Sequence, residues 1–300
     1  MDVLLARQLR ERPAAPHGVP AGGPADRPLS ALESFDVLFE GGGLPGYDLP
    51  DDLARLYGRL GFLDTALYSN FVSSIDGVVT LGSNPSAGSV ISGRNRADRF
   101  LMGLLRACAD AVLLGAGTLR ATPGHHWTPQ HIFPDLAPSF AALRSTLGRK
   151  PDPRLVLLTS GGSIDTRHPA VVSGATIITT ESGARSLSAL PDTCDVIEVG
   201  KSGAVDVIRA LEELRSRGDR VILTEGGPHV MGELVKHGLV DEAFLTVSPV
   251  IAGRDREPRL GMVAGVEFLP EKGKWGRLLS ARRQGEFLFL RYGLAAGGRT

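Results

Sequence analysis

The sequence predicts an α/β fold: a mostly parallel central sheet flanked by helices, with an antiparallel hairpin near the C-terminus. Short apolar runs alternate with stretches of helical period through the middle of the chain, a pattern typical of parallel sheets covered on both faces. Two of these runs end in glycine-rich turns that lead directly into helices. Further on, Trp275–Arg283 and Glu286–Tyr292 flank Gln284-Gly285, which indicates a hairpin.

The N-terminal part of the chain differs in composition from the rest. Prolines recur among glycine and alanine over residues 1–30, so no core-forming period survives there. Leu53–Tyr57, with Asp51 and Asp52 as N-cap candidates, predicts one short helix within residues 31–64. We therefore expect a flexible tail and arm over residues 1–64 and one folded domain over residues 65–300.

Within this domain, strands and helices are expected to alternate. The predicted strands are Ala66–Val72, Ala111–Leu114, Arg154–Leu158, Ala175–Thr179, Val196–Val199, Val221–Thr224 and Glu242–Val247. The predicted helices are Ala97–Ala107, Ser182–Leu190, Val205–Arg217 and Val230–His237. Residues 123–153 are rich in proline, histidine and charge, and we expect a long loop there with one short helix near Ser139–Leu147.

Composition argues against several classes of function. Lysine plus arginine equals aspartate plus glutamate, at 33 each, which disfavours a nucleic-acid binder driven by bulk charge. Cys108 and Cys194 are far apart in the sequence, so neither a disulfide framework nor a cysteine-bound zinc is expected. No apolar run approaches the roughly 20 residues that span a bilayer. These features favour a cytoplasmic protein that partners neither nucleic acid nor membrane.

The two glycine turns are candidate binding sites for a phosphate group. Leu223–Gly232 leaves the strand Val221–Thr224 and opens a helix, whose free N–H groups would point at a ligand close to the glycine backbone. Ala111–Thr118 makes a second turn of this kind. The candidate residues are Gly115, Ala116, Gly117, Thr118, Gly226, Gly227, Pro228, His229, Val230, Met231 and Gly232. Neither turn matches the dinucleotide fingerprint or the P-loop, and a plain helix start is the alternative for each.

Three polar residues near these turns are further candidates. Asp98 falls in the first turn of the helix Ala97–Ala107, so it either caps that helix or anchors the N–C–N edge of a pyrimidine or pterin. Glu225 would repel a phosphate that it faced, so we expect it to point to substrate or to cap a backbone N–H. Ser73 ends a strand at the carboxyl edge, where open α/β sheets bind small molecules.

No constellation for a covalent nucleophile or a metal stands out. His125, His126 and His131 cluster in the long loop, but loop histidines are common and no metal is expected. The zinc deaminase signature and the G-x-S-x-G elbow are both absent. The pattern is typical of a site that binds a phosphate-bearing cofactor and leaves the chemistry to it.

In combination and order, these blocks resemble the riboflavin-biosynthesis pyrimidine reductases, whose domain has a dihydrofolate-reductase-like fold. The likeness spans roughly residues 65–292. The matching blocks are Asn70–Gly77, Asp98–Phe100 with Leu104–Ala107, Ala109–Arg120, Ile222–Pro228, Gly238–Glu242 and Thr246–Gly253.

The resemblance implies an NADPH-dependent reductase acting on a phosphorylated pyrimidine, as a homodimer. Such enzymes convert 5-amino-6-(5-phosphoribosylamino)uracil to the ribitylamino compound. NADPH would lie over Gly115–Thr118 and Gly227–Gly232, with Ser160 near its adenosine 2′-phosphate and Arg167 or Arg185 as sources of charge. Asp98 and Glu225 would face the substrate.

The chain departs from the commonest family pattern after Gly-Ala-Gly-Thr. Where the family continues with D-D-P-x-L, residues Ala121–Trp127 read Ala-Thr-Pro-Gly-His-His-Trp, and Thr122 replaces an aspartate that contacts cofactor. The absent zinc signature also indicates that the deaminase domain of bifunctional members is missing, so a stand-alone form is expected. Reduction of a dihydropterin on the same fold, and an NADP-binding module without turnover, are the alternatives.

Overall fold

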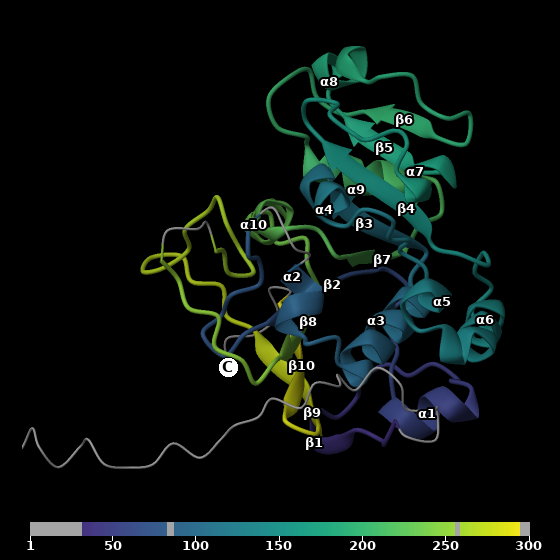
Figure 1. Ribbon diagram of the computed structural model, residues 1–300, viewed down its shortest axis with the longest axis vertical. Helices are drawn as coiled ribbons and strands as arrows, with labels where there is room; N and C mark the ends of the chain where they lie inside the picture. Colours follow the sequence, from purple (N-terminus) through teal and green to yellow (C-terminus); the bar gives the residue numbers. More distant parts are fainter. Residues whose placement is uncertain (1–31, 83–86, 256–258, 295–300) are drawn as a thin grey trace, which may run out of the picture.

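A ten-stranded sheet forms the centre of the computed structural model, which describes residues 32–82, 87–255 and 259–294. Its strand order is β1-β9-β10-β8-β2-β7-β3-β4-β5-β6 (Figure 1). From β8 to β6 neighbouring strands are parallel, whereas β1, β9, β10 and β8 pair antiparallel. The strands are β1 (Asp36–Glu40), β2 (Ala66–Ser73), β3 (Ala111–Gly115), β4 (Arg154–Thr159), β5 (Thr176–Thr179), β6 (Asp195–Glu198), β7 (Val221–Thr224), β8 (Glu242–Val247), β9 (Arg277–Gln284) and β10 (Phe287–Gly293).

Helices cover both faces of the parallel part of the sheet. They are α1 (Asp51–Tyr57), α2 (Ala87–Ile91), α3 (Arg96–Cys108), α4 (Ala116–Ala121), α5 (Pro129–Ile132), the 3-10 turn η3 (Pro134–Leu136), α6 (Ala137–Thr146), α7 (Pro169–Val172), α8 (Glu181–Ser186), α9 (Val207–Ser216) and α10 (Pro228–Lys236). Val112 and Leu114 of β3 belong to the core that includes α1, α3 and α6, while Ala111 and Leu113 belong to the core that includes α9 and α10. This alternation explains why β3 is apolar at every position.

The structure confirms the predicted fold class. The parallel sheet, its covering helices and the C-terminal hairpin are all present, and Gln284 pairs with Phe287 across the turn. Helix ends differ by a few residues; α8 stops at Ser186, because Leu187 is already extended, whereas the sequence suggested Leu190. The predicted helices at Leu53–Tyr57 and near Ser139–Leu147 correspond to α1 and α6.

Part of the predicted N-terminal arm is built into this fold. β1 was not predicted, and it forms the edge of the sheet beside β9. Leu53, Leu56 and Tyr57 of α1 are buried in the same core as α3. The arm therefore contributes to the core from Leu32 onward. The expected boundary at residue 65 stays a prediction, and residues 1–31 lie outside the described part of the chain.

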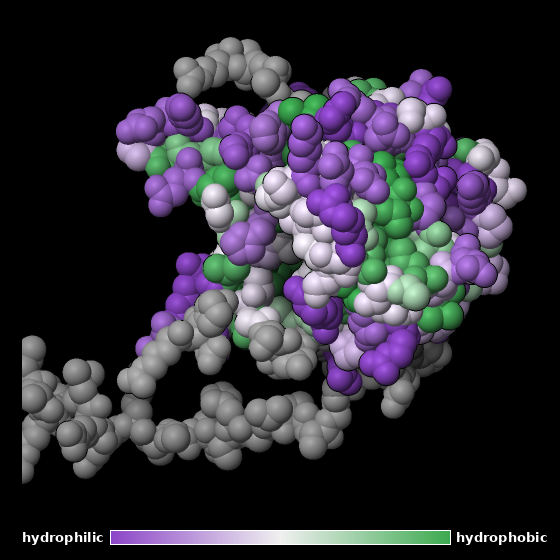
Figure 2. Space-filling model, turned by 90° about the horizontal axis from the view of Figure 1, so that it is seen from above, coloured by the Kyte–Doolittle hydropathy of each residue, from purple (hydrophilic) through white to green (hydrophobic). Residues whose placement is uncertain are grey.

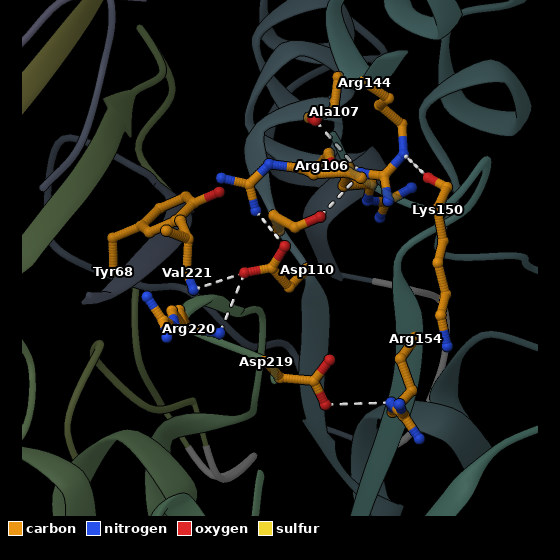
Figure 3. A network of polar contacts seen from close by, with 12 residues as sticks. Tyr68, Arg106, Ala107, Asp110, Arg144, Lys150, Arg154, Asp219, Arg220 and Val221 are labelled. Atoms are coloured by element: carbon orange, nitrogen blue, oxygen red, sulfur yellow. Dashed lines mark hydrogen bonds and ion pairs between the residues drawn. The ribbon is translucent and has the colours of Figure 1, made fainter. Parts of the chain in front are cut away.

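Helix α3 is fixed at both ends by side chains. At its start, the Asn95 carboxamide oxygen accepts hydrogen bonds from the N–H groups of Ala97 and Asp98, at 2.9 and 3.0 Å. At its end, the Tyr68 hydroxyl donates to the Leu105 carbonyl at 2.7 Å, and the Arg144 guanidinium donates to the carbonyls of residues 106, 107 and 109 (Figure 3). These donors satisfy carbonyls that have no partner within the helix.

The amino ends of β3 and β7 are joined by the same polar network. The Asp110 carboxylate accepts hydrogen bonds from the N–H groups of Arg220 and Val221, at 3.0 and 2.8 Å (Figure 3). Asp110 also pairs with Arg149, and Asp219 pairs with Arg154 at 3.0 Å. The amino edge of the sheet is thus a fixed frame, which leaves the carboxyl edge for a site.

The molecular surface is mixed in polarity. Seen from above, it is hollowed on one side, and hydrophilic and hydrophobic side chains are interspersed over this face (Figure 2). Among the described residues, no helix has the length and apolar character needed to cross a bilayer.

Candidate active site at the carboxyl edge of the sheet

A cavity of about 960 Å³ lies at the carboxyl ends of the central strands. Its walls come from the end of β2, the starts of α3, α4 and α10, the turn after β4, and the loop 122–132. The crossover connections bring these segments together, because the neighbouring parallel strands β2, β7, β3 and β4 all end at this edge of the sheet. The volume suits a drug-sized or larger ligand.

Both glycine turns face this cavity, and each opens a helix whose N-cap makes no side-chain hydrogen bond. Gly115 is the N-cap of α4 and Gly227 the N-cap of α10. By contrast, α3 and α9 are capped by Asn95 and Asp206. The free N–H groups and the positive dipole end of α10 are therefore open to an anionic ligand.

Close packing explains Gly115 and Gly226 and gives no structural reason for Gly227. A Cβ on Gly115 would lie 3.0 Å from Val230 Cγ2, and one on Gly226 would lie 2.9 Å from Val230 Cγ1. Gly227 has a φ of −67°, and a Cβ there would meet Thr118 Oγ1 at 3.5 Å, an ordinary contact. The fold thus tolerates a side chain at 227, and space for a ligand is the remaining reason for glycine.

Most of the residues predicted for the site line this one cavity. They are Asp98, Gly115, Ala116, Gly117, Thr118, Ser160, Glu225, Gly226, Gly227, Pro228, His229 and Val230. Three predicted residues lie outside its lining. The Ser73 hydroxyl donates to the Ser74 carbonyl, Met231 is fully buried in the core, and a Cβ on Gly232 would meet the Ala264 carbonyl oxygen at 2.3 Å. These three have packing roles in the structure.

At the Ser160 end of the cavity, the arginine that lines the wall is Arg120. Its Nη1 donates to the Ser163 carbonyl at 3.3 Å, beside the turn that follows β4. Arg167, which the sequence suggested as a source of charge, is almost fully exposed and pairs with Asp165. Neither Arg167 nor Arg185 lines the cavity.

Asp98 is buried in the cavity wall and does not cap its helix. Asn95 is the cap, so the helix-cap interpretation of Asp98 is wrong. Burial raises the pKa of Asp98 to about 6; the Ser92 and Thr246 hydroxyls partly oppose that shift, and the charge of Glu225 adds to it. A carboxyl with this pKa exchanges a proton near neutral pH, as a general acid must.

Glu225 is held by an arginine that sequence reasoning did not single out. Arg106 of α3 is fully buried and donates from Nε to Oε1 at 2.8 Å and from Nη2 to Oε2 at 2.7 Å. Such a bidentate pair fixes the carboxylate in the cavity wall. Asp98, Met102 and Arg106 follow one another at four-residue spacing along α3, and this stripe was the sequence signal for the cavity-facing side of the helix.

The histidine cluster lies in the wall next to this pair. The His125 ring meets the His131 ring edge-on, with centroids 4.7 Å apart, and the Trp127 ring at 5.0 Å. His125 and His131 line the cavity. Within the described residues, no three His, Cys, Asp or Glu side chains are arranged to hold a metal ion.

Comparison with known proteins places the chain in a family. The model of the RibD C-terminal domain matches residues 65–269. A 2,5-diamino-6-ribosylamino-4(3H)-pyrimidinone 5′-phosphate reductase from Aquifex aeolicus is 27% identical over 190 residues, which are 62% of this chain and 78% of that protein. A protein of the same name from Archaeoglobus fulgidus is 27% identical over 164 residues, covering 53% and 70%.

Solved structures agree on the fold. A pyrimidine reductase-like protein from Corynebacterium diphtheriae superposes with a TM-score of 0.63 at 24% identity, covering 82% of this chain and 99% of that one. The riboflavin biosynthesis reductase of Saccharomyces cerevisiae gives a TM-score of 0.52 at 14% identity, covering 79% and 94%. Since the family model spans well over half of its residues, this chain belongs to the RibD C-terminal domain family, the pyrimidine reductases of riboflavin biosynthesis.

Proposed function

We propose that this protein reduces 5-amino-6-(5-phosphoribosylamino)uracil to the ribitylamino product with NADPH. The observation that carries the proposal is that two parts of one cavity wall have different chemistry. Two glycine turns with helix N-termini open to an anion form one part of its wall, and the buried carboxyl of Asp98 forms another. Family membership supports the class of reaction, and this layout supports separate cofactor and substrate ends.

The residues of the glycine turns fit a dinucleotide phosphate. Gly115–Thr118 and Gly227–Val230 would hold it through backbone N–H groups, in the space that the missing Cβ of Gly227 leaves open. Ser160, with the Arg120 guanidinium beside it, would receive a 2′-phosphate. Bound NADPH would supply a hydride.

The protein's own contribution to the chemistry is a proton and an enclosed site. Reduction of the ring-opened imine adds a hydride to carbon and a proton to nitrogen. Burial raises the pKa of Asp98 to about 6, so it can hold a proton close to neutral pH, and we assign it the role of proton donor. Glu225 is held by the bidentate contact with Arg106, and we assign it the role of orienting the substrate.

A second candidate substrate is 2,5-diamino-6-ribosylamino-4(3H)-pyrimidinone 5′-phosphate. It is favoured by the names of the two relatives from Aquifex aeolicus and Archaeoglobus fulgidus. The two candidates differ at ring position 2, which carries oxygen in the uracil and an amino group in the diamino compound. An ionised Asp98 would suit the amino group, whereas a protonated Asp98 would suit the oxygen.

The test is the loss of NADPH absorbance with each compound. Purified protein is given the aminouracil, the diaminopyrimidinone or dihydrofolate, with NADPH or NADH. We expect turnover with a ribosylamino-pyrimidine phosphate and a higher kcat/KM with NADPH than with NADH. Turnover of dihydrofolate alone would move the assignment to a pterin reductase, and tight NADPH binding without turnover of any compound would indicate a binding module.

A further inference from the structure

The cavity wall formed by residues 122–131 replaces a segment that is acidic in the commonest family pattern. Here the wall presents His125, Trp127 and His131. The segment is firmly held: Arg106 Nη1 lies 3.4 Å from the carbonyls of His126 and Thr128, and His168 Nε2 lies 3.0 Å from the Thr122 carbonyl oxygen. A wall held in this way can present its side chains to a ligand in fixed positions and so recognise it selectively.

Arg106 determines which nitrogen of His125 carries the proton. Arg106 Nη2 lies 3.2 Å from His125 Nε2. A guanidinium has donors and no acceptor, so Nε2 must be the unprotonated nitrogen that accepts. The proton of the neutral ring is therefore on Nδ1.

His125 stays neutral because of its surroundings. Burial, and then the charge of Arg106, lower the pKa of His125 to about 2, and the neighbouring His131 and His126 act in the same direction. Nδ1 has no hydrogen-bond partner among the residues that the structure describes, and His125 is one of the residues that line the cavity. His125 thus offers a ligand one donor and no charge.

We propose that His125 is a specificity-determining residue that donates from Nδ1–H to a ring carbonyl oxygen of the pyrimidine substrate. Arg106 serves two partners at once: it holds the Glu225 carboxylate and it fixes the His125 tautomer. The wall then presents an acceptor, Glu225, and a donor, His125, which both contact Nη2 of one guanidinium. An amide-type N–H beside a carbonyl, as in a pyrimidine ring, complements this pair.

Two substitutions separate this role from a purely structural one. In His125→Asn, the amide nitrogen takes the position of Nδ1, so the donor to the cavity is kept and the acceptor for Arg106 is lost. In His125→Gln, the amide oxygen takes the position of Nε2, so the acceptor for Arg106 is kept and the donor to the cavity is lost. His126→Gln is the matched control, since its side chain is not part of the cavity lining.

The first experiment is calorimetric titration of 5-amino-6-(5-phosphoribosylamino)uracil into the wild type and these variants, beside NADPH titrations. We expect His125→Gln to weaken pyrimidine binding and kcat/KM about tenfold to hundredfold, with His125→Asn closer to the wild type. NADPH affinity and His126→Gln should match the wild type. A Gln variant that binds and turns over like the wild type, while Asn is impaired, would reduce His125 to a positioning residue for Arg106.

A second measurement addresses the tautomer itself, and the choice of a pyrimidine rests on the proposed function. Nitrogen NMR of imidazole-labelled protein should show Nδ1–H at His125, unchanged across about pH 5 to 8. A protonated Nε2 would overturn the inference whatever the substrate is. If the wild type binds NADPH but neither candidate pyrimidine, both the proposed substrate and the proposed role of His125 are rejected. Pyrimidine binding that no His125 variant alters overturns the inference alone.

Discussion

Two buried arginines near the C-terminal end of α3, whose side chains have different partners, illustrate the difference between a frame and a site. Arg144 at the amino edge has no carboxylate partner within the described part of the chain, and it donates to backbone carbonyls: Nε to that of Lys150, and Nη1 to those of Arg106, Ala107 and Ala109. Burial lowers the pKa of Arg144 to about 10, so it stays charged at neutral pH. The Arg106 side chain instead pairs with Glu225, and Arg106 lines the cavity.

The comparison teaches that burial of charge does not identify a functional residue. Arg144 lies at the C-terminus of α3, where the negative end of the helix dipole and unpaired carbonyls accept a cation. Arg144 is buried and is not among the residues that line the cavity. Arg106 is equally buried, but its partners are a carboxylate and a histidine that both face the cavity. What marks the site is a buried charge whose partners remain accessible.

The largest effect is expected from removing the frame. Arg144→Met removes the guanidinium that donates to the carbonyls of residues 106, 107 and 109, and we expect the free energy of unfolding to fall by about 3–5 kcal/mol. Arg144→Lys keeps the charge with fewer donors in reach and should lose less. Urea unfolding measures both, with turnover per folded molecule as the second readout. If folded Arg144→Lys lost substrate affinity without losing stability, the amino edge would have to be counted as part of the site.

The next effect should be confined to the carboxyl edge. Gly227→Val is compatible with the backbone, since φ is −67° and the nearest contact to a Cβ is ordinary. Its branched side chain would fill the space before the α10 N-terminus, and we expect NADPH affinity to fall at least about a hundredfold. Stability should change by less than about 0.5 kcal/mol.

Fluorescence titration of NADPH and thermal unfolding measure the two quantities for Gly227→Val. Gly42→Val is the control, because a Cβ at Gly42 meets nothing within 4 Å and Gly42 is not among the residues that line the cavity. Wild-type NADPH affinity in the folded Gly227→Val protein would show that this turn is not the phosphate cradle.

The sequence was a good guide wherever the pattern was local. Alternating apolar runs predicted the parallel strands, and Gln284-Gly285 predicted the hairpin, because short-range periodicity and turn chemistry decide both. β1 escaped notice because its pairing with β9 joins residues more than 240 positions apart, as for Asp36 with Arg283. Local sequence carries no signal of such a partner.

For the site, the same limit applied to side-chain partners. The glycine turns predicted a binding site, and residues of both turns line the cavity. The sequence does not single out Arg106, because its partners, Glu225 and His125, come from other segments of the chain. Asp98 was left open between cap and ligand, and only the position of the Asn95 carboxamide decided against the cap. Residues whose role depends on a distant partner require the fold.

The smallest effect, and the one that most sharpens the comparison, concerns Asp98. Its folded pKa of about 6 stands above its ordinary value of 3.8. Between about pH 4 and 6 the folded protein holds a proton that the unfolded chain has released, so stability falls as pH rises through this window. Above it, the ionised Asp98 destabilises the fold by on the order of 3 kcal/mol. Asp98→Asn should remove that penalty at pH 8 and change little at pH 4.

Replacing Asp98 should therefore change the stability of the fold in the opposite direction from replacing Arg144. We expect Asp98→Asn to be more stable than the wild type at pH 8, while kcat/KM for the pyrimidine falls about tenfold to hundredfold and NADPH affinity is unchanged. Unfolding curves at both pH values, steady-state kinetics and NADPH titration measure these effects. A less stable Asn variant would mean that the carboxylate is part of the frame. A loss of NADPH affinity as large as the loss of activity would place Asp98 at the cofactor end of the cavity.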